Sequence, residues 1–293
     1  MTRSALAPLF LVPFALLALR GSGAEDTPSP PVSGFAGSQA CLTCHEGQGH
    51  TLVHPHPDRE DPRCESCHGP GQAHVDSGGD PNLMQSFAEL PPGQANARCQ
   101  ACHTWQEQRF WPASAHSRAG VTCVSCHAVH RAEGANPHLL RQPDELSTCF
   151  GCHGVMRTRT WKSSHMPVRE GKLSCGDCHN PHGSPSEKML RDPSPQENCY
   201  RCHAEKRGPT LFEHPPVREN CMNCHDPHGS MHENLLVTRP PRLCQNCHIN
   251  TRHPSEPRSV TGPGSRFAFD KACVNCHTSV HGSNHPAGVR QQR

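Results

Sequence analysis

Hydrophobic residues are concentrated at the start of the chain. An apolar run of about 15 residues, Ala5 to Leu19, follows Arg3 and precedes small residues that end at Ala24. This order is typical of a secretory signal, and the run is shorter than the about 20 apolar residues of a membrane span. We therefore expect a signal peptide at residues 1–24, cleaved after Ala24, and a periplasmic product. A retained N-terminal anchor is the alternative.

The rest of the chain is polar and rich in Pro, Gly and Asn, and no stretch alternates apolar and polar residues as a β-strand does. We expect a flexible leader at residues 25–40, followed by one domain at residues 41–293. Short helices are predicted around the cysteine-bearing segments and at Asp80–Leu90, with loops elsewhere, including Ile249–Asp270. The predicted fold class is extended and mostly irregular, with short α-helices and little or no β-structure.

The composition agrees with this pattern. Apolar residues make up 33% of the 293 residues, aromatic residues make up 4%, and there are 30 prolines. A soluble domain usually contains about 45–50% apolar residues, so this chain is too polar to build an ordinary side-chain core. If the chain folds, it must therefore bury some other apolar component.

Ten copies of the string Cys-x-x-Cys-His use all 20 cysteines of the chain. This string is the attachment signal for c-type haem, in which two thiols bond the macrocycle and the histidine is the proximal iron ligand. One helical turn between the cysteines directs both sulfurs to the same edge of a flat ring. The predicted attachment cysteines are Cys41, Cys44, Cys64, Cys67, Cys99, Cys102, Cys123, Cys126, Cys149, Cys152, Cys175, Cys178, Cys199, Cys202, Cys221, Cys224, Cys244, Cys247, Cys273 and Cys276. The predicted proximal ligands are His45, His68, His103, His127, His153, His179, His203, His225, His248 and His277.

Zinc binding, disulfide formation and thioredoxin-like chemistry account less well for the cysteines. Zinc centres and disulfide frameworks do not need a histidine directly after the second cysteine, yet all ten strings have one. Thioredoxin-like chemistry uses one such string at a strand–helix junction, not ten in proline-rich sequence. We therefore predict ten haem c groups, one for each string.

The haems would supply the missing core and would also change the charge. The 269 residues after residue 24 amount to about 27 residues for each haem. The formal net charge is +2, and it falls to about 0 after loss of Arg3 and Arg20. Twenty propionates, half offset by ten ferric cores, would bring the oxidised protein to about −10. No net basic surface remains, which argues against a nucleic-acid partner.

The ten motifs fall into five two-haem units, numbered here 1 to 5. They occupy residues 41–98, 99–148, 149–198, 199–243 and 244–293. Each unit has a first motif, a loop that contains a histidine, a second motif and a trailing histidine. The sequence around the motifs also repeats, since Asn-Pro-His-Gly-Ser at 180–184 matches Asp-Pro-His-Gly-Ser at 226–230. A period near 50 residues is typical of an array of stacked units, which predicts a haem wire.

The chain has 25 histidines, and the fifteen outside the motifs are candidates for the distal iron ligands. The unit pattern selects the loop histidines His56, His116, His165, His214 and His253 and the trailing histidines His74, His130, His182, His228 and His281. His281 is preferred to His285 because it precedes Gly-Ser, as the trailing histidines of units 3 and 4 do. We expect His50, His54, His138, His232 and His285 to face solvent or bond propionates, although His50 and His54 compete with His56 in unit 1. Which distal histidine serves which haem is open, and a neighbouring unit can supply it.

Two histidine ligands leave no open position on the iron. Such a site suits electron transfer rather than substrate binding, and its potential is generally lower than with histidine and methionine. Met166 and Met222 lie near motifs but are expected to pack. Trp105, Trp111 and Trp161 are expected to pack against haem. The predicted function is therefore electron transfer without catalysis.

These motifs resemble those of the periplasmic decahaem cytochromes of the MtrA/DmsE type. The resemblance is carried by HAEKRGP at 203–209, PVREN at 216–220, NCHDPHGS at 223–230, LCQNCH at 243–248 and VHGSNHPAG at 280–288. It implies an extended bis-histidine haem wire, associated with the outer membrane inside a β-barrel porin. It also implies contact with an extracellular multihaem cytochrome or a terminal reductase. Periplasmic or inner-membrane electron-donor cytochromes are further expected partners.

The direction of electron flow is open, since relatives run electrons outward to ferric minerals or dimethyl sulfoxide, or inward from ferrous iron. Two other functions also remain open. A multihaem reductase, for example of nitrite or sulfur oxyanions, needs one haem with an open position, which unit 5 would most readily provide. A free periplasmic shuttle needs no barrel partner.

Folding should depend on haem attachment, because the side chains alone offer too little apolar surface. Chain produced without haem is expected to be unfolded, which circular dichroism and thermal melting would detect. A compact haem-free chain that melts cooperatively would contradict this prediction.

Overall fold

The computed structural model describes residues 34–51, 64–130, 138–249 and 273–291, and every helix in these ranges is short. The longest α-helix, α5 (Pro92–Gln100), has 9 residues. The other α-helices are α1 (Ser38–Leu42), α2 (Glu46–Thr51), α3 (Cys64–His68), α4 (Gln72–Asp76), α6 (Ala115–Arg118), α7 (Cys123–Cys126), α8 (Glu145–Phe150), α9 (Gly154–Arg159), α10 (Pro195–Tyr200), α11 (Pro215–Glu219) and α12 (Arg242–Gln245). The 3-10 helices are η1 (Pro81–Leu83), η2 (Gln106–Ala113), η3 (Cys175–Asp177), η4 (Glu187–Met189), η5 (Ala204–Lys206), η6 (Cys221–Asn223), η7 (Glu233–Leu235), η8 (Cys273–Asn275) and η9 (Pro286–Arg290). The described residues form isolated β-bridges but no strand or sheet, so the predicted fold class is confirmed.

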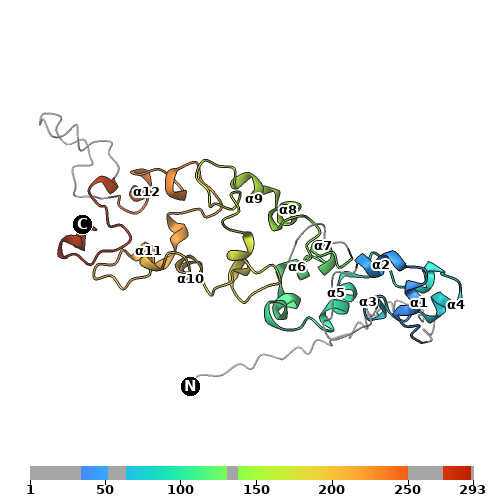
Figure 1. Cartoon of the computed structure of the whole chain (residues 1–293). Coiled ribbons are helices and arrows are strands. Elements are labelled where there is room, and N and C mark those ends of the chain that lie inside the picture. The colour runs from blue at the N-terminus through green and yellow to red at the C-terminus, as the bar shows by residue number, and fades with distance from the viewer. Residues whose placement is uncertain (1–33, 52–63, 131–137, 250–272, 292–293) are drawn as a thin grey trace, which may run out of the picture.

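The elements follow one another along a single long axis. Helices α1 to α4 lie at one end of the molecule, and α11, α12 and the C-terminal segment lie at the other (Figure 1). Among the described residues, the buried hydrophobic side chains are Ala95 and Trp111 alone. No helix in this part of the chain is long and apolar enough to cross a membrane. The polypeptide therefore has little core of its own, as its composition predicts.

The Cys-x-x-Cys-His motifs set the positions of the helices. In nearly every motif the histidine N–H donates to the carbonyl of the first cysteine, as from His153 to Cys149 at 2.9 Å, which closes one helical turn. The first motif of each unit comes at the end of an α-helix, namely α1, α5, α8, α10 or α12. The second motif forms a single turn, namely α3, α7, η3, η6 or η8. The prediction of short helices around the motifs is therefore confirmed.

Two local predictions need correction. The helix expected at Asp80–Leu90 is wrong, because only η1 forms there. The Asp80 side chain accepts the Asn82 N–H at 3.0 Å and begins η1, but extended backbone at Met84 ends it. Residues 36 and 37, expected within the flexible leader, are held by hydrogen bonds of 2.8 and 2.9 Å from their N–H groups to the Glu65 carboxylate. The expected signal peptide, the loop at 249–270 beyond its first residue, and His54, His56 and His253 lie outside the described residues.

Units 4 and 5 pack on the preceding unit through the segment around their trailing histidines. The backbones of Ser230 and Ser164 exchange hydrogen bonds of 2.7 and 3.0 Å, and those of Ser283 and Phe212 exchange bonds of 3.0 and 2.8 Å. Gly229 and Gly282, which precede Ser230 and Ser283, make the close approach possible. Gly229, for example, has a φ of 126°, and a Cβ atom there would overlap the Arg159 carbonyl. The repeated His-Gly-Ser string therefore forms the joint between units.

Replacing Gly229 by Ala should weaken this joint. A side chain at positive φ costs about 1–3 kcal/mol, and the overlap with Arg159 adds to that cost. We expect the melting temperature of the haem-loaded protein to fall by several degrees. Gly154→Ala is the matched control, since a Cβ at this helical glycine would meet nothing within 4 Å. Equal melting temperatures for the two variants would contradict the prediction.

Candidate haem-binding sites

The cysteines of successive motifs lie beside one another. All 20 belong to the described residues, and none forms a disulfide. Within each unit the first cysteines of the two motifs interact, in the pairs Cys41–Cys64, Cys99–Cys123, Cys149–Cys175, Cys199–Cys221 and Cys244–Cys273. Burial and the neighbouring thiol raise the pKa of Cys199 to about 12. Between units, thiols also lie close enough to interact electrostatically, in the pairs Cys67–Cys99, Cys126–Cys152, Cys178–Cys202 and Cys224–Cys247. The attachment motifs therefore form one unbroken series.

A polar side chain before the first motif holds the second motif in place. The Asn96 side-chain oxygen accepts the Cys123 N–H at 2.8 Å, and the Ser38 hydroxyl accepts the Cys64 N–H at 3.2 Å. In unit 3, Glu145 accepts the Gly176 N–H at 2.5 Å. These bonds connect residues that are about 25 to 30 positions apart and keep the two motifs of a unit side by side.

The cysteines are not arranged for zinc. Among the described residues, Glu145, Cys149 and Cys175 are the one group of three potential ligands whose atoms all lie within 4.8 Å of one another. A structural zinc site needs four such ligands. The geometry therefore does not support zinc binding by the motifs.

Seven motif histidines face a predicted distal histidine. The ring centroids are 6.0 to 6.3 Å apart in the pairs His45–His74, His68–His130, His116–His153, His127–His182, His179–His228, His214–His248 and His225–His281. A metal between two facing imidazoles, with bonds of about 2 Å as zinc makes, needs a centroid separation of roughly 6 Å. Each pair therefore leaves the room that one bound iron requires.

The pairs connect neighbouring units in a regular register. A loop histidine faces the first motif histidine of the next unit, as His116 of unit 2 faces His153 of unit 3. A trailing histidine faces the second motif histidine of the preceding unit, as His228 of unit 4 faces His179 of unit 3. The sequence left this pairing open, and the structure shows that consecutive units exchange histidines in both directions.

Unit 1, the first unit along the chain, departs from the register. Its trailing His74 faces His45 of the same unit instead of a histidine of another unit. His74 follows the second motif histidine, His68, by six residues, whereas the spacing is three in units 2 to 4. The longer spacing places His74 on α4 and directs it back to its own unit.

Backbone carbonyls orient many of these rings. Nδ1 of His127, His179 and His225 bonds a carbonyl oxygen at 2.7, 2.9 and 2.7 Å. His74, His116, His165, His214 and His277 make the same kind of bond, at 2.6 to 2.9 Å. A carbonyl can only accept, so Nδ1 must donate, and the lone pair of Nε2 is left for a metal.

Sequence reasoning missed these carbonyl acceptors. For His179 and His225 the acceptors are Lys188 and Asn234, which lie nine residues further on and have φ of 55°. The residue two positions later, Leu190 or Leu236, forms an isolated bridge with the same histidine. The usable signal is a leucine eleven residues after the motif histidine, repeated in units 3 and 4.

Burial favours the neutral form of several of the paired imidazoles. It lowers the pKa of His68, His127, His182, His228 and His281, and for all but His127 the facing histidine lowers it further. Metals bind the neutral form of imidazole, so this environment favours ligation at neutral pH.

One predicted pair does not meet in the structure. The register assigns His165 to His203, but Nε2 of His165 lies 3.2 Å from Glu170, and Nδ1 of His203 lies 3.6 Å from Glu205. The register also assigns His56 to His103, and elimination leaves His253 for His277, but His56 and His253 lie outside the described residues. His281 rather than His285 faces His225, which favours the choice made from the sequence.

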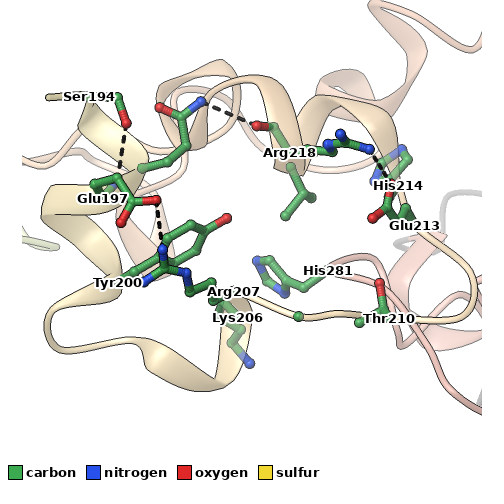
Figure 2. Close-up of a pocket in the computed structure, with 13 residues that line it drawn as sticks. Ser194, Glu197, Tyr200, Lys206, Arg207, Thr210, Glu213, His214, Arg218 and His281 are labelled. Carbon is green, nitrogen blue, oxygen red and sulfur yellow. Dashed lines mark hydrogen bonds and ion pairs between the residues drawn. The ribbon is translucent and has the colours of Figure 1, made fainter.

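A cavity of about 330 Å³ is lined by residues of units 3 and 4 and by His281 of unit 5. Figure 2 shows His281 and the Tyr200 ring pointing into it, with Arg207 and Arg218 on its walls. The two arginines bond Glu197 and Glu213 at 3.2 and 2.9 Å. Arginine side chains bond carboxylates well, so these two are candidates to hold haem propionates.

The tryptophans and methionines differ in their exposure. Trp111 is buried, and its ring lies 6.3 Å from that of His182. Trp105 and Trp161 are 60% and 68% exposed on the polypeptide, and Met222 is 47% exposed. Packing of the two exposed tryptophans against haem stays a prediction.

Comparisons with known proteins agree with this geometry. The doubled CXXCH motif family matches residues 165–208 and 214–253, and the family of NrfB-like cytochrome c-type proteins matches residues 64–140. Each doubled motif joins the second motif of one unit to the first motif of the next. Multiheme cytochrome MtrA of Shewanella baltica (strain OS185) is 42% identical over 274 residues, which cover 88% of this chain and 81% of that protein.

Free thiols beside histidine, facing imidazoles, oriented Nδ1 atoms and a polypeptide without its own core all fit covalently attached haem c. They define a multihaem c-type cytochrome, a class that transfers electrons. Since the similarity extends over most of both chains, this chain belongs to the MtrA family of multihaem cytochromes.

The haem-loaded protein should bring His165 and His203 together, because the same register pairs His116 with His153 and His214 with His248. Replacing His165 by Ala should then convert one haem from low spin to high spin, which paramagnetic resonance would detect. His232→Ala is the control, since His232 is no predicted ligand. A spectrum of the His165 variant without a new high-spin signal would refute the assignment.

Proposed function

We propose that this chain is a decahaem cytochrome that conducts electrons across the outer membrane inside a β-barrel porin. The ten motifs would hold one haem each, with the proximal and distal histidines assigned above. The observation that carries the proposal is the series of facing histidine pairs that connects consecutive units. This arrangement favours a series of haems whose irons have no open position for substrate, and so electron transfer over catalysis.

The residues of the chain prepare each site for electron transfer. Bound haem supplies an iron that alternates between the ferric and ferrous states. The facing imidazoles would both bind the iron and would leave no position on it for water or substrate. Their Nδ1 bonds to carbonyls, such as the 2.9 Å bond from His214 to Val280, fix the ring orientation. Little rearrangement is then needed when the charge changes.

The elongated shape and the exposed apolar side chains of the polypeptide support a position inside a barrel. The units follow one long axis from end to end (Figure 1). Phe35, Leu211 and Ile249 are 71%, 67% and 76% exposed on the polypeptide. In this proposal, bound haem and the wall of a barrel would cover such side chains.

The proposed location and partners rest on the sequence and on the family. The predicted signal peptide at residues 1–24 would bring the chain to the periplasm. There it would accept or deliver electrons through periplasmic or inner-membrane cytochromes. At the outer surface, a multihaem cytochrome or terminal reductase would complete the path.

One observation favours a second candidate, a reductase with an open haem. Of the described motif histidines, His203 lies beside Glu205 instead of a distal histidine. If the site stays open after haem attachment, it is in unit 4 and not in unit 5, where the sequence placed it. A high-spin signal in the wild-type spectrum, or rapid binding of carbon monoxide, would favour the reductase.

Reconstitution into liposomes tests the conduit directly. The haem-loaded protein is combined with a candidate β-barrel porin, in liposomes that contain a redox dye. External reductant should reduce the enclosed dye. Replacing Cys175 and Cys178 together should remove one haem from the interior of the series and reduce this flux strongly.

Lys172→Ala provides the matched control, because Lys172 is an exposed side chain in the same unit. Its flux should equal that of the wild type. Full conduction by the double cysteine variant would show that the haems do not form one obligatory line. Failure of the protein to copurify with any barrel would favour the free shuttle.

A further inference from the structure

The residue after the second motif histidine differs between units at one repeated position. It is Ala128 in unit 2, Asn180 in unit 3 and Asp226 in unit 4. The backbone is the same in all three, since their N–H groups donate to Leu139, Met189 and Leu235 at 2.7, 2.8 and 2.7 Å. The chain therefore places an apolar, an amide and a carboxylate side chain at equivalent backbone positions.

The amide and the carboxylate adopt the same orientation. Asn180 Oδ1 accepts the His182 N–H at 3.1 Å, and Asp226 Oδ1 accepts the His228 N–H at 3.1 Å. Asp226 Oδ1 also lies 3.8 Å from Nδ1 of the His228 ring. The oxygen therefore holds the backbone of the trailing histidine in both units, but it is charged in only one.

The Nδ1 atoms of the three trailing histidines have different surroundings. Those of His130 and His182 are buried and have no hydrogen-bond partner in the described structure. That of His228 faces the Asp226 carboxylate. Negative charge beside the Nδ1–H of a ligating imidazole makes the ring a stronger donor to the metal.

Other charges near these rings do not cancel the difference. Glu107 acts on His182, but it is neutralised by Arg191, whose NH1 lies 2.6 Å from its carboxylate. Asp226 has a weaker partner in Arg159, at 3.7 Å, and the Arg159 side chain is 40% exposed. The facing motif histidines, His127 and His179, stand in equivalent positions in the two sites.

We propose that Asp226 is a positioning residue that lowers the reduction potential of the haem held between His179 and His228. Stronger donation from His228 stabilises the ferric state. Of the three haems that the trailing histidines His130, His182 and His228 would bind, this haem therefore has the lowest reduction potential. The inference rests on the proposed ligand pairing. It adds that the residue after the second motif histidine gives each unit its own potential.

Exchanging the two side chains tests the proposal. Asp226→Asn removes the charge and can keep the bond to the His228 N–H, as Asn180 does to His182. Potentiometric titration of the haem-loaded full-length protein, followed by paramagnetic resonance, should show one low-spin haem with a raised potential. Asn180→Asp should lower the potential of a different haem. A tenfold change in the ratio of oxidised to reduced haem corresponds to about 59 mV, and a change of about that size is expected.

Two further variants separate the possible failures. Glu233→Gln removes an exposed charge in unit 4 and should leave every potential unchanged. His228→Met changes the proposed ligand itself and should raise one potential. If His228→Met shifts one haem and neither exchange variant shifts any, the role of Asp226 is refuted while the pairing stands. If His228→Met also shifts none, both the pairing and the role of Asp226 are refuted.

Discussion

The pairing of imidazoles from consecutive units, at a separation that one bound iron would span, is the interaction on which the rest of the structure depends. The polypeptide buries almost no apolar side chains, and its helices are too short to be stable alone. What relates the units is a gap of about 6 Å between histidines of different units, which bound iron would bridge. Isolated β-bridges at Ser230 and Ser283, and the close approach of the backbone at Gly229 and Gly282, bring neighbouring units near enough for these rings to meet. We therefore expect the fold and the bound cofactors to depend on each other.

Much of this arrangement can be read from the residues. The cysteine motifs predict the helical turns, and the repeated histidines identify the set of side chains that face the motif histidines. The partner of each histidine could not be read, because loop and trailing histidines lie at similar distances along the chain from several motifs. The carbonyl acceptors at Lys188 and Asn234 were also missed, since they depend on backbone conformation and not on side-chain type. The helix expected at Asp80–Leu90 failed because Asp80 and Pro81 favour a short 3-10 turn.

Local electrostatics gives each site an individual character within the repeated frame. The repeat keeps the geometry of the imidazole pairs nearly constant, whereas the side chains around them vary. Ala128, Asn180 and Asp226 stand in one backbone environment and differ only in polarity and charge. Because the backbone bonds are preserved, such changes alter the energy of a site without disturbing its neighbours. A repeated scaffold can thus carry different potentials along its length.

The closure of unit 1 on itself has a consequence for how such chains evolve. His74 returns to His45, so the first unit needs nothing from an earlier one, while interior units give one histidine forward and one backward. Duplicating an interior unit in the gene would create matching donors and acceptors at both new junctions. Deleting one would likewise rejoin compatible ends. Cytochromes with different numbers of units can thus arise by duplication of whole units, because each unit already carries the histidines that its neighbours need.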